Sequence, residues 1–464
     1  MSREKAIVLG VDLGTSRFKA AIFDRHGAQR GLGRRDLAPD RGDGQRCELP
    51  VDRFWRTLSE AIKEAMTCAG ANAGDLAAVA YASQANSFLL LDETYRPLTS
   101  ILLWPDRRVP KPPPAMRALW ARPDFLKVTG LGAEAGTEFA AAKILWFQDR
   151  HPRLWRQARY VMTLSDYLVH SLSARRVGDA GTASLLGMLD ARNLAWWPTA
   201  LELLHLDAER LSQPLRPGSV AGAITAEGAA RVGLAEGALL AVGNLDHYLA
   251  ALGAGLDRLA PLSESTGTVT AVVRSCTEIC PATGVCFGPA FEPGRYDQLL
   301  YSENSAAVLA WYRERFAPEL TFEELLEMAG RIETAEAPVA LPNADRYPDR
   351  EGFQGRREDM GHGHYVRAIL NSTAASLAEL VERASAVAFP RSVLATGGGA
   401  RSDLWLQTYA DHLGCDVLRA TTEEPACRGA AMLAARATGW FDNLSQAADA
   451  WCRAGRRFSP ARAK

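Results

Sequence analysis

Short strand-like runs alternate with helical segments in both halves of the chain, and this alternation limits the fold more than any other feature. Residues 6–12 and 18–23 are apolar runs on either side of a Gly-Thr-Ser turn at 14–16, which predicts a β-hairpin. Residues 54–66 carry apolar side chains at helical spacing, and Asp52 is placed to cap the start of that helix. Strands that alternate with helices are typical of an α/β fold.

Polar stretches fall where predicted strands end. Residues 76–82 and 88–92 are strand-like and flank the polar stretch 83–87. A second polar stretch, 243–247, follows an apolar run and precedes a helix predicted at 248–255. The first polar stretch is therefore expected at a strand end, and the second at a strand-to-helix turn.

The second half repeats the pattern of strands and helices. A strand pair with hydroxyls and glycine at its turn is predicted at residues 263–273, and a long amphipathic helix at 365–387. A short strand at 393–395 then enters the triple glycine 397–399. The repetition favours a second lobe of the same α/β type.

Two hydroxyl-rich turns resemble each other across the chain. Residues 12–16 read Asp-Leu-Gly-Thr-Ser, and residues 264–268 read Glu-Ser-Thr-Gly-Thr, each beside predicted strands. With 464 residues the chain is long enough for two or three domains. We therefore predict two related lobes, residues 1–245 and 246–464, with the boundary near 246–258.

The composition limits the kinds of partner. The chain has 53 Lys and Arg against 54 Asp and Glu, a formal net charge of −1, so no overall field attracts nucleic acid or an anionic membrane. Apolar residues make up 47%, which suits a globular protein with a full core. We therefore expect neither nucleic acid nor a membrane as a partner.

No segment has the pattern of an export signal or a membrane span. The first apolar run is short and ends at Asp12. The most apolar long segment, residues 238–256, contains Asn244, Asp246 and His247 near its middle, where a bilayer would penalise them. The eight cysteines are too scattered for a disulfide framework. We expect a cytoplasmic protein.

The two hydroxyl-rich turns have the chemistry of phosphate sites. Gly, Thr and Ser in a tight turn bring backbone N–H groups and hydroxyls within reach of phosphate oxygens. Asp12, at a strand end, could hold the water shell of a Mg²⁺ that bridges those phosphates. The alternative interpretation of the first turn is an ordinary hairpin.

The triple glycine and Asp246 are the other candidates. Bare backbone at 397–399, between a strand and a helix capped by Ser402 or Asp403, would let a flat ligand lie close. The spacing fits neither a GxGxxG fingerprint nor a P-loop, so a Rossmann site and a Walker ATPase are disfavoured. Asp246 follows a strand and precedes a helix, where it is either a site carboxylate or a helix cap.

In their order along the chain, these segments resemble the FGGY family of carbohydrate kinases, a branch of the actin-like ATPase superfamily. GVDLGTSRFKAAIFD at 10–24 resembles the family's first phosphate motif. GNLDHYLAALGAG at 243–255 resembles its catalytic segment, and STGT at 265–268 its second phosphate motif. GGGARSDLWLQ at 397–407 resembles its adenosine motif. The similarity spans nearly the whole chain.

Two further segments are similar to xylulokinases within that family. SQANSFLLLD at 83–92 resembles their Ser-Gly-Gln-Met-His-Gly segment, and LLWPDRR at 102–108 resembles their Trp-Asn-Asp-Gln-Arg segment. The resemblance implies two ribonuclease-H-like lobes with a cleft between them. It also implies transfer of the γ-phosphoryl group of ATP, with Mg²⁺, to a hydroxyl of a ketose or polyol, with D-xylulose as the first candidate.

The resemblance assigns roles to individual residues. Asp246 would be the general base that takes the proton from the attacking hydroxyl, and Asp12 and Asp246 would hold the metal. The residues that would contact the nucleotide are Asp12, Gly14, Thr15, Ser16, Lys19, Thr266, Gly267, Gly398 and Ser402. The residues that would line the sugar pocket are Gln84, Ala85, Asn86, Trp104, Asp106 and His247.

Some positions depart from the family pattern. Ala85-Asn86 stands where xylulokinases have Met-His, and His247 follows the catalytic Asp where Asn is common. Arg17 replaces a small residue of the first turn. Glu264 places a carboxylate just before the second phosphate turn, where its charge would repel phosphate unless it points away. These differences leave the sugar open.

Several alternatives therefore remain. The acceptor could be of the ribulose, fuculose, glycerol or erythritol type. A chain of this superfamily could instead be a non-catalytic nucleotide-binding sugar sensor or a chaperone-like ATPase, although the carboxylate at position 246 favours a kinase. A homodimer is a possible assembly.

Overall fold

The computed structural model describes residues 6–42, 45–385 and 388–461. Contacts divide the chain into two compact units, each built from three segments. Unit 1 comprises Met1–Gly253, Cys276–Gln298 and Glu424–Trp451, and unit 2 comprises Ala254–Ser275, Leu299–Glu423 and Cys452–Lys464. The domain boundary expected between residues 245 and 246 stays a prediction.

The central sheet of unit 1 is mixed, with the order β13-β14-β5-β1-β2-β3, and β15 also pairs with β5. β1 and β2 form the predicted hairpin, with Asp12 opposite Lys19, and this prediction is confirmed. β1 also pairs in parallel with β5. These strands are β1 Ile7–Leu13, β2 Arg17–Asp24, β3 Gln29–Asp36, β5 Leu76–Ser83, β13 Val220–Ala223, β14 Leu239–Ala241 and β15 Asn244–Leu245.

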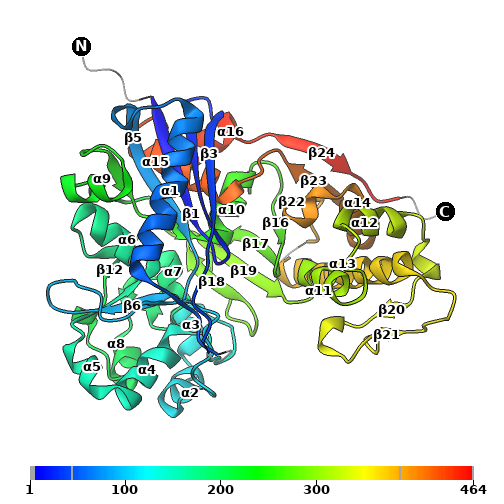
Figure 1. The fold of residues 1–464 in the computed structure, drawn as a ribbon, viewed down its shortest axis with the longest axis horizontal. Coiled ribbons are helices and arrows are strands. Elements are labelled where there is room, and N and C mark those ends of the chain that lie inside the picture. The colour runs from blue at the N-terminus through cyan, green and yellow to red at the C-terminus, as the bar shows by residue number, and fades with distance from the viewer. Residues whose placement is uncertain (1–5, 43–44, 386–387, 462–464) are drawn as a thin grey trace. The chain divides into compact units, whose positions relative to one another are not determined.

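Helices α1 (Val51–Ala69) and α15 (Pro425–Ala437) pack against this sheet (Figure 1). Because side chains alternate along a strand, successive residues of β1 point to different helices. Leu9, Val11 and Leu13 join the apolar cluster of α1, whereas Gly10 lies against Cys427 of α15. The turn predicted to bind phosphate thus extends from a strand that is buried on both faces.

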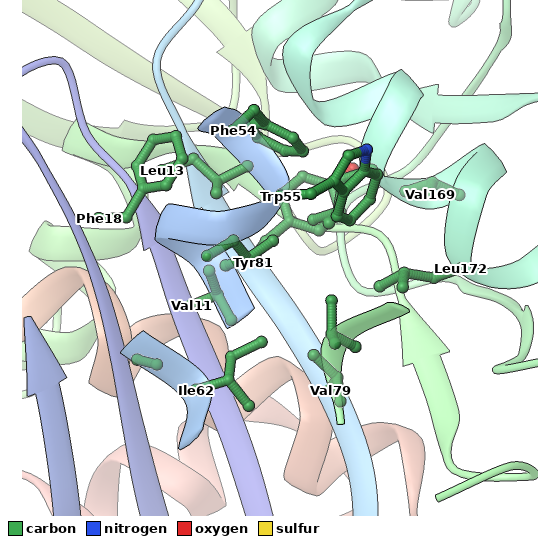
Figure 2. Close-up of a cluster of buried hydrophobic side chains, with 14 of the residues drawn as sticks. Val11, Leu13, Phe18, Phe54, Trp55, Ile62, Val79, Tyr81, Val169 and Leu172 are labelled. Carbon is green, nitrogen blue, oxygen red and sulfur yellow. The ribbon is translucent and has the colours of Figure 1, made fainter. Parts of the chain in front are cut away.

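The core between β1, β5 and α1 is rich in aromatic side chains (Figure 2). Phe18 and Phe54 meet edge to face with ring centroids 5.5 Å apart. The Trp55 indole N–H donates to the Tyr167 hydroxyl at 3.3 Å, which satisfies a polar atom within the core. This packing holds the two strands that lead to the predicted site.

The prediction that Asp52 caps α1 is wrong. Pro50 is the N-cap residue and makes no side-chain cap, and Asp52 lies inside the first helical turn. The helix begins at Val51, two residues before the start that an Asp52 cap would give. At its observed position the Asp52 carboxylate still favours the helix, because it faces the positive end of the helix dipole.

The rest of unit 1 consists of short helices and small sheets. One small sheet has the order β4-β7-β6-β8, β9 pairs with β12, and β10 pairs with β11. The strands are β4 Glu48–Leu49, β6 Phe88–Leu91, β7 Ile101–Leu102, β8 Tyr160–Thr163, β9 Val177–Asp179, β10 Leu189–Asp190, β11 Ala195–Trp196, β12 Gln213–Leu215 and β18 Cys286–Pro289. The helices are α2 Pro114–Trp120, α3 Phe125–Thr129, α4 Ala140–Arg150, α5 Pro152–Gln157, α6 Leu164–Ser173, α7 Ala180–Ser184, α8 Pro198–Leu203, α9 Ala226–Val232, α10 Asp246–Ala254 and α16 Leu444–Trp451, with 3₁₀ turns η1 Ala73–Asp75 and η2 Ala208–Arg210.

The sheet of unit 2 is built around β16 and β22, which are parallel neighbours. β16 also pairs with β17 in antiparallel fashion, which confirms the predicted strand pair, and β22 continues to β23 and β24. The strands are β16 Ser263–Thr266, β17 Thr270–Cys276, β20 Val339–Ala340, β21 Phe353–Gln354, β22 Ser392–Gly397, β23 Asp416–Ala420 and β24 Ala454–Phe458, and β19 (Tyr296–Ser302) enters this unit from unit 1. The helices are α11 Ala306–Phe316, α12 Phe322–Gly330, α13 His362–Ala384 and α14 Asp403–Leu413, with 3₁₀ turns η3 Thr334–Glu336, η4 Ala344–Arg346 and η5 Gly399–Arg401.

Two helix predictions in unit 2 can be compared with the structure. α13 confirms the long helix but begins three residues earlier than predicted, and residues 386–387 of the predicted span lie outside the described residues. Ser402, rather than Asp403, is the cap of α14, since its side chain accepts from the Trp405 N–H at 3.2 Å. None of the helices in the described ranges is long and apolar enough to cross a membrane.

Candidate active site

The first hydroxyl-rich turn lies at the carboxyl end of β1, beside the ends of two parallel neighbours. Asp12 pairs with Ala82 of β5, and Ala82 pairs on its other side with Asn244 of β15. The residues that follow these strands, Gly14, Gln84 and Asp246, therefore lie at one edge of the sheet. Three segments predicted to carry phosphate, sugar and catalytic residues are brought together in unit 1.

Gln84 and Trp104 hold this turn in place. The Gln84 side-chain amide donates to the carbonyl oxygens of Leu13 and Gly14 at 3.3 and 3.1 Å. The Trp104 indole N–H donates to Thr15 Oγ1 at 2.8 Å. Gly14 is required for space, because a Cβ there would lie 2.9 Å from the Arg17 carbonyl oxygen. Two residues predicted for the sugar pocket thus contact the predicted phosphate turn.

An ion-pair network lies at the other side of Asp12. Lys19 Nζ is 3.2 Å from Asp12 Oδ2 and 2.9 Å from Glu424 Oε2. Arg34 contacts the same Glu424 through Nε and Nη2, both at 2.7 Å. Burial alone would lower the pKa of Lys19, but Asp12 and Glu424 outweigh burial and raise it, so the ammonium stays charged. Glu424 therefore holds Lys19 beside Asp12, next to the turn predicted to bind phosphate.

Asp12 is a buried carboxylate, and only one of its two oxygens is paired within the described residues. Its Oδ1 atom is buried and has no hydrogen-bond partner among the residues that the structure describes. Burial raises the pKa of Asp12 to about 6, Lys19 opposes that rise, and the nearby charge of Asp246 adds to it. Asp12 and Asp246 are two carboxylates whose charges repel each other, and Asp12 Oδ1 has no partner. This arrangement suits a hydrated divalent cation. The residues therefore fit Mg²⁺, although no cluster of three or more ligating His, Cys, Asp or Glu occurs within the described ranges.

Replacing Asp12 with asparagine tests this environment. Because folding raises the pKa of Asp12 from 3.8 to about 6, the folded chain binds this proton more tightly than the unfolded chain. The wild type should therefore lose up to roughly 3 kcal/mol of unfolding free energy from this group between pH 4 and pH 6. The asparagine side chain does not titrate, so Asp12→Asn should gain relative stability across this range. Urea unfolding from pH 4 to 7 measures the difference, and a difference independent of pH would contradict the assignment.

Asp246 is the first residue of α10 and is half-buried. Its Oδ1 atom accepts a hydrogen bond of 2.8 Å from the backbone N–H of His247, the next residue of α10. Asp246 therefore lies inside the helix rather than at its N-cap position, so the cap interpretation is not confirmed, and the role as a site carboxylate stays a prediction. The side chain of His247 is also partly exposed.

The remaining residues predicted for the sugar pocket differ in accessibility. Asn86 has a left-handed backbone, φ +59°, and its side chain donates to the Leu185 carbonyl and accepts from the Ala140 N–H. The Asp106 side chain is fully buried, and both of its oxygens accept hydrogen bonds from Arg108. Ala85 is partly exposed. In this conformation the polar atoms of Asn86 and Asp106 are bonded to backbone groups and to Arg108, and their role toward a sugar stays a prediction.

Lys143 of α4 is a supporting residue that the sequence did not single out. Its side chain is fully buried and donates to the carbonyl oxygens of Trp104 and Glu138 at 3.1 and 2.8 Å. Burial lowers the pKa of Lys143 to about 7. The sequence does contain a signal for this residue, since Lys143 stands within an apolar, alanine-rich helical run. Such a run is expected to be buried, and a buried amine needs hydrogen-bond partners.

Removing the Lys143 amine should loosen Trp104. In Lys143→Met the two carbonyl oxygens lose their donors, so we expect the segment that carries Trp104 to move. If Trp104 contacts the sugar, KM for the sugar should rise about tenfold or more while kcat changes less. Steady-state kinetics of the variant, with its thermal unfolding as a control for folding, measures both. Equal falls in kcat and kcat/KM would contradict this role.

The predicted nucleotide residues of unit 2 lie at the carboxyl ends of β16 and β22. Thr266 pairs with Gly397, and a Cβ on Gly397, where φ is +81°, would lie 2.6 Å from the Thr266 carbonyl oxygen. A Cβ on Gly399 would approach the Thr266 side chain to 3.0 Å. Gly267 has open space beside it, and Gly398 is exposed. The two segments predicted to bind phosphate and adenosine thus lie side by side at the ends of parallel strands, with Thr266 fully buried and Gly397 and Gly398 exposed.

Comparison with known proteins shows to which family the chain belongs. A family model described as "FGGY family of carbohydrate kinases, N-terminal domain" matches residues 7–253, and its C-terminal counterpart matches residues 337–438. The chain belongs to the FGGY carbohydrate kinases. Its phosphotransferase activity is supported by both family domains and by relatives that are themselves named kinases.

This carbohydrate kinase is similar to relatives with different substrates. It is 26% identical over 468 residues to the xylulose kinase of Bacillus subtilis, covering 98% of this chain and 92% of that protein. It is 25% identical over 485 residues to an autoinducer-2 kinase of Enterobacter, covering 98% of this chain and 90% of the relative. Identities near 25% leave the sugar undetermined.

Solved structures show that this kinase has the fold of the family, an α/β fold of two actin-like lobes. The xylulose kinase of Rhodospirillum rubrum matches with a TM-score of 0.86 and 23% identity, covering 98% of this chain and 94% of that chain. A glycerol kinase of Plasmodium falciparum, solved with ADP, matches with a TM-score of 0.81 and 17% identity, covering 98% and 94%. The predicted fold class is confirmed.

Proposed function

We propose that this kinase transfers the γ-phosphoryl group of ATP to a hydroxyl of a ketose or polyol, with D-xylulose as the first candidate and Asp246 as general base. The observation that carries the proposal is the meeting of Asp246, Asp12 and the turn at Thr15 on one edge of the sheet of unit 1. Kinases of this family use ATP, and D-xylulose is favoured by the xylulose kinases among its relatives.

The proposed mechanism assigns each residue a physical task. Asp246 accepts the proton of the sugar hydroxyl, since its carboxylate is partly exposed at the start of α10. Lys19, held by Glu424, lies beside the first turn and attracts phosphate oxygens. Mg²⁺, when held by Asp12 and Asp246 through water, would neutralise charge on the phosphates. The Trp104 ring would present an apolar face to the sugar.

The nucleotide contacts in each unit belong to this proposal. In unit 1 the hydroxyls of Thr15 and Ser16 and the backbone of Gly14 would meet phosphate oxygens. In unit 2 the backbone of Gly267 would do the same, Thr266, which is fully buried, would support that turn from below, and the exposed backbone at Gly398 would lie along the nucleoside. Ser402 would contact the nucleoside through its backbone, since its hydroxyl caps α14. Gln84, Asn86 and Asp106 would shape the sugar pocket, and Ala85 and His247 would face the sugar.

A second candidate acceptor is autoinducer-2, which is favoured by the relatives named autoinducer-2 kinases. Sugars or polyols of the ribulose, fuculose, glycerol and erythritol types are the other candidate acceptors of the phosphoryl group. A cytoplasmic location and a homodimer remain parts of the proposal. The sugar sensor and the chaperone-like ATPase are opposed by the kinase family models that match both parts of the chain.

A substrate panel tests the proposal directly. ADP release from ATP and Mg²⁺ should be stimulated strongly by one sugar or polyol and weakly by its epimers. The product should contain a phosphate ester, detected by phosphorus NMR, in amounts equal to the ADP formed. ATP hydrolysis that is indifferent to every acceptor, or that is stimulated by peptides, would contradict the assignment and favour the sensor or chaperone alternatives.

A further inference from the structure

The second turn, residues 267–269, joins β16 to β17 and is the accessible part of the second phosphate motif. Thr266 and Glu264 on β16 are fully buried, and their side chains are hydrogen-bonded to each other. Gly267, by contrast, is partly exposed with open space beside it, and Thr268 is exposed. The Gly267 N–H donates to the Val269 carbonyl oxygen at 3.0 Å, which closes the turn. A phosphate at this motif would therefore meet Gly267 and Thr268.

Ser305 of unit 2 holds this turn from the start of α11. Its side chain is fully buried at the N-cap position of that helix. The Ser305 hydroxyl donates to the Thr268 carbonyl oxygen at 2.6 Å, and Ser305 Oγ accepts the Ala307 N–H at 3.3 Å. A hydroxyl can donate and accept at the same time, so both contacts are satisfied. A helix cap needs only the second contact, whereas the first joins the second turn to α11.

Asn304 fixes the backbone that carries Ser305. The Asn304 side-chain amide donates to the Ser372 carbonyl oxygen and to Ser376 Oγ of α13, at 3.1 and 2.9 Å. Its Oδ1 atom accepts the Asn343 N–H at 3.2 Å. Asn304 is itself buried, so breaking these bonds would leave polar groups unpaired away from water. Ser305 therefore extends from a fixed segment.

The bond from Ser305 limits the freedom of the second turn before a ligand arrives. A loop that must become ordered on binding loses affinity, whereas a loop held in advance does not. Without the Ser305 hydroxyl, water could take its place at the Thr268 carbonyl oxygen, but a water molecule does not fix the direction of the turn. The nucleotide would then have to order the turn itself.

We propose that Ser305 is a positioning residue for nucleotide binding, which fixes the second turn through the Thr268 carbonyl oxygen so that Gly267 and Thr268 face the phosphates in one arrangement. The inference rests on the proposed function, because it takes the second turn as a phosphate contact. Ser305 acts through this turn and not by touching the nucleotide, since its side chain is buried. This role differs from that of a helix cap, and the difference can be measured.

Ser305→Ala should weaken nucleotide binding. The Kd for ADP, measured by isothermal titration of the full chain with Mg²⁺ and without sugar, should rise about five- to tenfold, which corresponds to the loss of one well-aligned hydrogen bond. KM for ATP should rise by a similar factor. KM for the sugar should stay at the wild-type value, because the residues proposed for the sugar pocket belong to unit 1.

Thr321 offers a matched control, because it caps another helix of the same unit. Its Oγ1 atom accepts the Glu324 N–H at 3.2 Å at the start of α12, and the residue is exposed. Thr321→Ala therefore removes a helix cap and should lower the unfolding temperature, as Ser305→Ala does, but it should leave the Kd for ADP unchanged. An equal rise of the Kd in both variants would show that Ser305 acts only as a cap, and would overturn the proposal.

Two further variants keep the test decisive. Ser305→Thr retains the hydroxyl and should bind ADP with a Kd within about twofold of the wild type. Ser305→Gly keeps most of the helix stability that a cap provides but has no hydroxyl, so it should bind ADP as weakly as Ser305→Ala. The glycine variant decides the question if Ser305→Thr does not fold. A folded Ser305→Ala or Ser305→Gly protein that binds ADP as tightly as the wild type would overturn the proposal.

The same measurements separate this inference from the kinase assignment. Weaker ADP binding by Ser305→Ala, in a protein that phosphorylates no sugar, would remove the proposed function and leave the role of Ser305 intact. Sugar phosphorylation together with an unchanged Kd in Ser305→Ala would do the reverse. Absence of ADP binding by the wild type would overturn both.

Discussion

Asp246→Asn is expected to lower the rate of sugar-dependent ADP release by about 10²–10⁴-fold, the contribution of a general base. The asparagine side chain keeps the size of the aspartate and can stay at the start of α10, but it cannot take the proton from the sugar hydroxyl. ADP binding should change little in the absence of both sugar and Mg²⁺, since Asp246 would meet the nucleotide only through the metal. The loss should therefore appear mainly in kcat.

A matched control is available on another helix of unit 1. Asp52 also lies in the first turn of a helix and is exposed. Asp52→Asn therefore removes one negative charge from a helix start, as Asp246→Asn does, but at a residue with no proposed role in the site. That variant should keep wild-type kinetics. The mechanism is wrong if Asp246→Asn retains more than about a tenth of the wild-type kcat while its far-ultraviolet circular dichroism and unfolding temperature match those of the wild type.

The local parts of this site could be predicted because they depend on neighbouring residues. The β1–β2 hairpin follows from two apolar runs and a Gly-Thr-Ser turn, and the structure confirms it. Ser402 could be named as a cap for the same reason, since capping joins residues three apart. Asp246 could be placed at a strand-to-helix junction from the change of pattern around it.

The remaining parts depend on contacts between distant segments. Glu424 supports Lys19 from the far end of the sequence, and no local pattern shows that these two charges meet. The Asp52 cap was wrong because a helix start can shift by two residues without changing its apolar face. Gln84 and Trp104 were predicted to face the sugar, and their contacts with the phosphate turn needed the structure. The site roles themselves stay predictions until kinetics test them.

The second large effect is expected from Gly429→Val, because three segments of the site meet on glycine backbone. A Cβ on Gly429 of α15 would lie 2.0 Å from the Leu249 carbonyl oxygen of α10, and a Cβ on Gly253 would lie 1.9 Å from the Pro425 carbonyl oxygen. A Cβ on Gly10 of β1 would lie equally close to the Cys427 carbonyl oxygen of α15, at 1.9 Å. α15 therefore contacts both the strand that carries Asp12 and the helix that begins with Asp246.

A valine at position 429 cannot fit without moving α10 away from α15, since the atoms it would meet belong to the backbone rather than to flexible side chains. We expect the free energy of unfolding to fall by at least about 3 kcal/mol, measured by urea unfolding. Gly74→Ala is the control in the same unit, because a Cβ there has open space and the backbone is not left-handed. The effect of this variant on the free energy of unfolding should stay within about 0.5 kcal/mol.

Where Gly429→Val still folds, the shifted start of α10 should also weaken sugar turnover, because a base displaced by about 1 Å loses its alignment with the hydroxyl. A Gly429→Val protein as stable and as active as Gly74→Ala would show that close backbone packing does not position Asp246.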